Sequence, residues 1–426
     1  MISRLPIFLL AATVLAGLSV PVLAANEDLQ LVGDGSMTDN RDLLRGSYEC
    51  GYGCDAGPPP SEPFNPPFLI DWSVALRGAY VQEGTTSRWE VSIIPALGLH
   101  HEGLRSTFDL DAEAEIIKPQ DTVARIGALR LSAAGEYALD EVTNFATDGD
   151  LTLTQAAPSD PSNPAGTAIA PRVLDADFAA TLTRDIGIAY VGLRGSVGRS
   201  DYGDTTLNSG VLIDNSFSSN TRYGGGLRVS HRLTPIVAAF ADGSVEYRIY
   251  DAPSPTLLVP LDSTDYVGKI GLQAAIGDIV EAEASVGVAL RRFANTGLAD
   301  VQAALYDASI TFRPDETLEL TGTVGTEIGA PGPSGTGTAS IERVATGEAR
   351  YKVNTWWSVW AAAGWSRKTA VAAVTEETSY NVGAGSEYRL NSHVSFTADY
   401  TFTRREVTAV APVNTHKVTA GVKVSR

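Results

Sequence analysis

The chain has 426 residues, a formal net charge of −18 and 41 glycines, and 44% of its residues are hydrophobic. The negative charge gives no support to nucleic-acid binding, which needs a basic surface. After the leader, the chain contains no apolar run of about eighteen residues, which excludes a bundle of membrane-spanning helices.

Residues 1–25 have the features of a secretory signal peptide. Arg4 supplies a short basic start, residues 5–22 are mostly apolar, and the stretch from Val22 to Ala25 ends in small residues suited to cleavage. A retained membrane anchor is the less favoured alternative. We therefore expect the mature protein to leave the cytoplasm.

Residues 26–67 read as an extended, largely unpaired periplasmic arm that ends in a proline-rich stretch. The only two cysteines, Cys50 and Cys54, lie within this arm. In an exported chain their spacing favours a small disulfide loop. A metal site is less favoured because no histidine lies nearby.

From residue 68 onward, apolar and polar residues alternate with a period of two, as in β-strands with one apolar face. Near residue 110 one face carries Phe108, Leu110, Ala112, Ala114 and Ile116, and the other carries Asp109, Asp111, Glu113 and Glu115. Three such alternations follow one another between Asn381 and Ser425. The pattern predicts an all-β domain over residues 68–426.

Short polar corners recur along this domain. They centre on Asp140, Asp185, Thr234, Asp278, Asp315, Asn354 and Asn391, at intervals of 45, 49, 44, 37, 39 and 37 residues. Longer polar segments lie between them, at 148–171, 201–219, 252–264 and 329–338. We predict sixteen to eighteen strands, and we prefer eighteen if residues 143–154 include a weak strand.

A closed transmembrane β-barrel explains the pattern better than a soluble sandwich or a propeller. Strands of ten or more residues suit a tilted membrane strand and exceed the usual soluble length of about 5 to 6 residues. The polar faces carry charges of both signs, and short corners alternate with long loops, as in outer-membrane barrels. Closure is required because an open sheet edge in hydrocarbon leaves backbone groups unpaired.

Aromatic residues gather beside two of the corners. The first group is Trp356, Trp357, Trp360 and Trp365, and the second is Tyr388, Phe396, Tyr400 and Phe402. They are predicted to form girdles at the bilayer interface, with packing between loops as the alternative.

The C-terminal half resembles the second group of beta-barrel porins found in Gram-negative envelopes. The resemblance rests on AGSEYRLNSHVSFTADY at 384–400, TRREV at 403–407 and VTAGVKV at 418–424, and FRPDETLELTG at 312–322 repeats the cadence. It covers the chain from about residue 68. It implies a barrel in the Gram-negative outer membrane, in a family sometimes linked with polysaccharide export.

The sequence predicts no cofactor, no metal site and no enzyme. None of the five histidines has a metal-ligand spacing. His393 and Ser395 have the spacing used by some barrel lipid hydrolases, but a polar corner is favoured. Asp148 and Asp150 could bind calcium weakly in a loop, although a solvated turn is favoured.

The residues that we expect to carry the function face the barrel lumen. The predicted acidic set is Asp109, Asp111, Glu113, Glu115, Glu281, Glu283, Glu319 and Glu327, and the basic set is Arg77, Arg228, Lys269, Arg291 and Arg389. An excess of inward carboxylates attracts cations. Acids and bases that pair across strands and fill the bore are the alternative.

Two functions are therefore expected from the sequence. The first is a passive, weakly cation-preferring diffusion pore for small solutes or ions, embedded in outer-membrane lipid. The second is a non-conducting envelope component with a periplasmic or polysaccharide-export partner, in which the arm plugs the bore or docks that partner.

Overall fold

The computed structural model describes residues 68–120, 123–158, 163–164, 166–331, 337–408 and 411–426. The predicted signal peptide, the arm at 26–67 and the Cys50–Cys54 pair lie outside the described residues. No helix among the described residues is long and apolar enough to cross a membrane.

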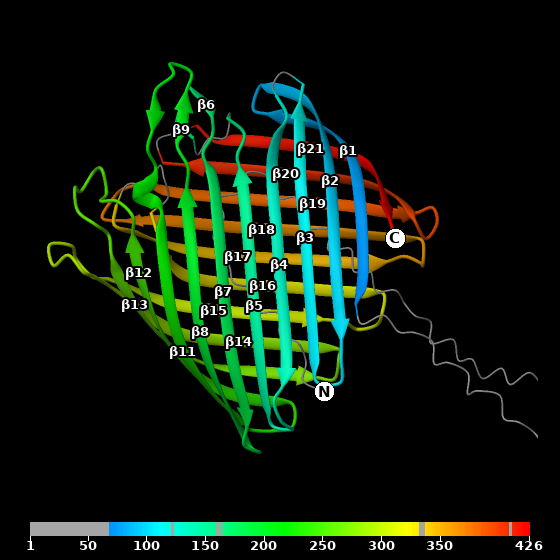
Figure 1. The fold of residues 1–426 in the computed structure, drawn as a ribbon, viewed down its shortest axis with the longest axis vertical. Helices are drawn as coiled ribbons and strands as arrows, with labels where there is room; N and C mark the ends of the chain where they lie inside the picture. The colour runs from blue at the N-terminus through cyan, green and yellow to red at the C-terminus, as the bar shows by residue number, and fades with distance from the viewer. Residues whose placement is uncertain (1–67, 121–122, 159–162, 165, 332–336, 409–410) are drawn as a thin grey trace, which may run out of the picture. The chain divides into compact units, whose positions relative to one another are not determined.

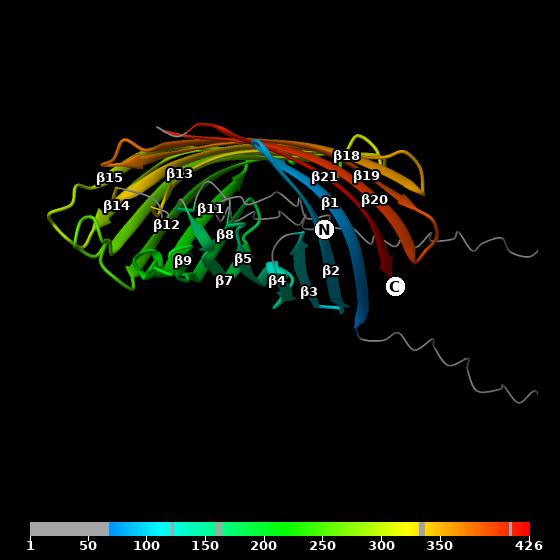
Figure 2. The ribbon, with the colours of Figure 1, turned by 90° about the horizontal axis from the view of Figure 1, so that it is seen from above.

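Residues 69–425 form one antiparallel sheet of 18 strands that closes on itself (Figures 1 and 2). The first strand, β1 (Leu69–Glu83), pairs with β2 (Thr86–Glu102) on one side and with the last strand, β21 (Val413–Ser425), on the other. The closed barrel and the preferred strand number are thereby confirmed. The predicted weak strand is β5 (Thr143–Gln155), which pairs along its length with both neighbours.

The remaining barrel strands follow in chain order. They are β3 (Ser106–Pro119), β4 (Arg125–Ala138), β7 (Arg172–Asp185), β8 (Ala189–Tyr202), β11 (Asn220–Arg232), β12 (Val237–Tyr250), β13 (Ser263–Ile276), β14 (Val280–Phe293), β15 (Val301–Phe312), β16 (Leu318–Gly329), β17 (Ala339–Lys352), β18 (Trp357–Val371), β19 (Glu376–Arg389) and β20 (Val394–Val407). Three short strands, β6 (Thr167–Ile169), β9 (Thr205–Leu207) and β10 (Leu212–Ile213), form a separate small sheet. A single turn of 3-10 helix, η1, spans Ser216–Ser218.

The alternation of the sequence sets the two faces of the barrel wall. Large apolar side chains are exposed along one face, for example Leu76 at 54%, Ile270 at 65% and Val286 at 52%. We call this the outer face, and the opposite face the inner face. An exposed apolar band is what a lipid-facing surface requires.

Short corners fill one end of the barrel, and the longer loops lie at the other end, which also holds the two-residue turn 84–85 between β1 and β2. We call the end with the short corners the corner rim, and the start of β1 and the end of β21 also lie there. Its connections are 103–105, 139–142, 186–188, 233–236, 277–279, 313–317, 353–356 and 390–393. The longer connections, among them 156–171, 203–219, 251–262 and 330–338, form the loop rim. The predicted loop 148–171 is too long, because Asp148 to Gln155 belongs to β5.

Side-chain hydrogen bonds close the corners. The carboxylates of Asp140, Asp185 and Asp315 each accept a hydrogen bond from the backbone N–H two residues later. The amide oxygens of Asn354 and Asn391 accept the equivalent bonds. These are Asx turns, which explains why Asp and Asn recur at the corner positions.

The ladder between β15 and β16 is short. It runs over five residue pairs, from Ala308 opposite Val324 to Phe312 opposite Leu320, whereas β16 and β17 pair over twelve. Towards the loop rim, side chains contact β16 in place of the ladder. Arg291 of β14 donates to the carbonyls of Ile328 and Gly329 at 2.9 and 2.8 Å.

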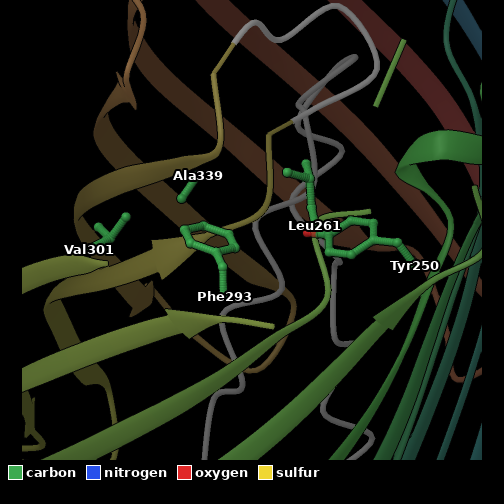
Figure 3. Packing of buried hydrophobic residues seen from close by; sticks show 5 residues of the cluster. All are labelled: Tyr250, Leu261, Phe293, Val301 and Ala339. Carbon is green, nitrogen blue, oxygen red and sulfur yellow. The ribbon is translucent and has the colours of Figure 1, made fainter. Parts of the chain in front are cut away.

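A hydrophobic cluster lies at the loop rim near this gap in the ladder (Figure 3). Its buried members are Tyr250, Leu261, Phe293, Val301 and Ala339, and Leu298, Ile328, Ala330 and Val371 pack against them. Leu261 comes from the 251–262 connection, so this loop packs against strand ends on the barrel wall.

Candidate functional site

The structure places all of the predicted lumen residues on described strands. Arg77 lies on β1, the carboxylates from Asp109 to Glu115 on β3, Arg228 on β11, Lys269 on β13, Glu281, Glu283 and Arg291 on β14, Glu319 and Glu327 on β16, and Arg389 on β19. By strand alternation each lies on the inner face, opposite the exposed apolar side chains.

The inner face holds several ion pairs that join strands. Arg228 lies 2.7 Å from Glu283, and Lys269 lies 2.8 Å from Asp307. Glu113 on β3 lies 3.2 Å from Arg130 on β4. Part of the predicted charge is therefore neutralised locally.

The carboxylate ladder of β3 contacts a histidine that the sequence did not connect with it. A ring nitrogen of His100 on β2 lies 2.7 Å from Asp109, and the other nitrogen lies 3.9 Å from Asp71 on β1. The three side chains therefore form a small charged cluster on the inner face of β1, β2 and β3.

A group of fourteen charged side chains lines a cavity of about 470 Å³ enclosed by strands β5 to β18. We call this cavity the chamber. Nine carboxylates and five cationic groups line it: Asp148, Asp150, Asp175, Asp177, Glu246, Asp265, Asp307, Glu327 and Glu342, with Arg194, Arg222, Arg248, Lys269 and Lys368. Of the residues predicted from the sequence, it brings together only Lys269 and Glu327.

Most of the chamber residues were not predicted from the sequence, and Asp148 and Asp150 were assigned to a loop. Both are on β5, and Asp175 and Asp177 follow the same spacing on β7. The signal was present in the sequence as an aspartate at every second position. The glycine between Asp148 and Asp150, together with the Pro- and Ser-rich sequence that follows, indicated a turn instead.

Between β5 and β15, five carboxylates of the chamber are paired with an arginine or a lysine. Arg194 contacts Asp148 at 3.0 Å, Arg222 contacts Asp177 at 2.8 Å, Arg248 contacts Glu246 at 2.8 Å, Lys269 contacts Asp307 at 2.8 Å and Arg291 contacts Asp265 at 2.6 Å. We call these five pairs the paired wall.

Arg291 is the most enclosed member of the paired wall. Its side chain is 1% exposed, and it donates to both carboxylate oxygens of Asp265 at 2.6 Å. With the two β16 carbonyls, it reaches four acceptors. This bidentate geometry and full set of partners are the conditions under which a buried ion pair is tolerated.

Four carboxylates of the chamber have no ion pair within the described part of the chain: Asp150, Asp175, Glu327 and Glu342. Glu327 and Glu342 lie directly opposite each other on β16 and β17. Asp175 accepts a hydrogen bond from the Ser200 hydroxyl at 2.7 Å. The chamber therefore carries an excess of negative charge.

One further ion pair holds a loop at the loop rim. Arg199 on β8 donates to both carboxylate oxygens of Asp251, at 2.7 and 2.5 Å. These hydrogen bonds hold the pKa of Asp251 below its usual range. Asp251 therefore stays charged and keeps the start of the 251–262 connection tied to β8.

The aromatic and histidine predictions had mixed outcomes. Trp356 and Trp357 are exposed, at 52% and 42%. Trp360 has the strand parity of Lys368, on the inner face, and packs against Gly383 and Gly385 of β19, so its assignment to a girdle is wrong. Nδ1 of His393 lies 3.1 Å from the backbone oxygen of Ser425.

Comparison with solved structures finds several similar chains. The outer membrane protein OpdK from Pseudomonas aeruginosa has 10% sequence identity and a TM-score of 0.42, with 84% of this chain and 99% of OpdK covered. OccK3 (OpdO) from the same organism has 14% identity and a TM-score of 0.40, with coverage of 84% and 96%. The FrpB iron transporter from Neisseria meningitidis has 9% identity and a TM-score of 0.42, with coverage of 79% and 62%.

No curated protein matches the chain in sequence. A family model described as "Putative beta-barrel porin 2" matches residues 69–426, which is the whole barrel. The chain therefore belongs to this family of beta-barrel porins, and it is a porin-like β-barrel of the outer membrane.

Proposed function

We propose that the barrel is a passive diffusion pore for small solutes, with a weak preference for cations. A barrel with this number of strands is wide enough to enclose an aqueous channel. The predicted lumen residues and the chamber residues would then line the solute path. This role is in keeping with the porin family to which the chain belongs.

The cation preference rests on the composition of the chamber. Nine carboxylates and five cationic groups line it, and with Arg291 of the paired wall included the chamber has an excess of three negative charges. Walls of low dielectric around a charged path concentrate ions of the opposite sign, and the effect weakens as salt rises. The chamber therefore favours the entry of cations over anions of the same size.

Planar-bilayer recordings of the purified full-length protein test the proposal, alongside a variant that lacks residues 26–67. Stable single-channel steps are expected from the full-length protein. If the arm occupies the bore, the shortened variant conducts more. No channel activity in either form would contradict the pore and favour a non-conducting envelope role.

A further inference from the structure

The inner face of β16 and β17 contains two like charges, Glu327 and Glu342, that form no ion pair with any described residue. Glu327 and Glu342 are direct cross-strand neighbours, and such positions place Cβ atoms about 4.5 to 5.5 Å apart. Like charges in this arrangement are destabilising. Their presence on the chamber wall calls for a positive partner.

Glu342 is the more enclosed of the two carboxylates. It is 9% exposed, and its Oε2 atom has no hydrogen-bond partner among the described residues. A buried carboxylate oxygen without a partner loses the solvation that water provided. Because Glu342 lines the chamber, a ligand in the chamber can supply that partner.

The nearby cationic groups do not fill this role. Lys368 lies opposite Glu342 in the β17–β18 register, yet no ion pair within 4.0 Å joins them in the described structure. Arg222 and Arg248 line the same chamber. However, they are engaged by Asp177 and Glu246.

We propose that Glu327 and Glu342 bind the primary ammonium or guanidinium group of a small organic cation in the chamber. Both groups carry several N–H donors, and paired carboxylates only accept, so two adjacent carboxylates complement either one. The cavity of about 470 Å³ has the size of a small-molecule site. This inference rests on the proposed pore and names the class of solute that it favours.

Asp150 and Asp175 extend the site on the other side of the chamber. They lie on β5 and β7, line the same cavity, and have no ion pair among the described residues. A solute with two cationic groups can therefore interact with both sets of carboxylates. Diamines are the simplest probes of this arrangement.

Calorimetric titration of the full-length protein in detergent at low salt tests the inference without requiring conduction. The probe is 1,5-diaminopentane, and glutarate, with the same chain length and opposite charge, is the matched control. Saturable binding of the diamine and none of glutarate is expected. In the double variant E327Q/E342Q the dissociation constant should rise at least about tenfold, because charge-assisted hydrogen bonds are lost.

Glu387→Gln is the control variant, because Glu387 lies on the inner face of β19 but does not line the chamber. It should bind the diamine as the wild type does. If the double variant does not fold, Glu342→Gln alone serves the same test. Unchanged binding in the folded double or single variant, or equal binding of glutarate, would overturn the inference.

Bilayer recordings separate this inference from the proposed pore. If the protein is a pore and the diamine binds in the chamber, the diamine blocks the potassium current, and E327Q/E342Q relieves the block. A protein that conducts but does not bind the diamine contradicts the inference and leaves the pore intact. A protein that binds the diamine but never conducts contradicts the pore.

Discussion

The paired wall and the β16–β17 wall face the same chamber with the same kinds of side chain, yet their chemistry differs. On the paired wall five carboxylates each have an arginine or lysine within 3.0 Å. On β16 and β17, Glu327 and Glu342 face each other, and no arginine or lysine of the described structure lies within ion-pair distance of either carboxylate. The comparison shows that strand register decides whether an inward charge holds the wall together or remains available to a solute.

The largest effect is expected from Arg291→Met, which removes the centre of the paired wall. It leaves Asp265 and two β16 carbonyls without their donor, and breaking a buried pair in this way costs about 3–5 kcal/mol. Urea unfolding of protein refolded into lipid vesicles gives the free energy of unfolding. Arg292→Met is the matched control, since Arg292 is 62% exposed, and equal losses in the two variants would contradict the role of Arg291.

A slightly smaller loss is expected from Phe293→Ala, which removes a buried ring from the cluster beside the paired wall. The change should destabilise the barrel by about 3 kcal/mol, as for other buried phenylalanines. It should also raise single-channel conductance if the cluster narrows the pore. Phe396→Ala, at an outer-face site that is 46% exposed, should cost less and leave conductance unchanged.

Neutralising one carboxylate on each wall should shift stability in opposite directions. Glu342→Gln relieves the repulsion from Glu327 and should raise the free energy of unfolding by roughly 0.2–1 kcal/mol. Asp307→Asn breaks the 2.8 Å pair with Lys269 and should lower the free energy of unfolding. The same urea titration measures both variants, and a loss of stability in both would show that the two walls do not differ.

The smallest effect is expected at the corner rim, far from both walls, and it depends on pH. The Thr317 hydroxyl and backbone N–H donate to Asp315 and lower its pKa. Its charge therefore stabilises the corner above the unfolded pKa of about 3.9, and this contribution is lost as pH falls through the lower folded value. Thermal unfolding between pH 5 and pH 2 should show less acid sensitivity in Asp315→Asn, because Asn354 and Asn391 close their corners with neutral amides.

Strand alternation and corner spacing were enough to predict the closed barrel and its eighteen strands. They were enough because alternation fixes the direction of each side chain, and because strands that cross a membrane must close into a barrel to pair every backbone group. The chamber could not be predicted, because its residues come from strands that are distant in sequence. Pairs such as Arg291 with Asp265 depend on register, and a register shift of one residue would reverse the direction of each side chain.

The most direct test of the account is the reversal potential of single channels under a gradient of potassium chloride. Cation selectivity is predicted, it should decrease as the salt concentration rises, and E327Q/E342Q should reduce it. A channel that prefers chloride, or whose selectivity is unchanged in E327Q/E342Q, would contradict the role assigned to the unpaired carboxylates.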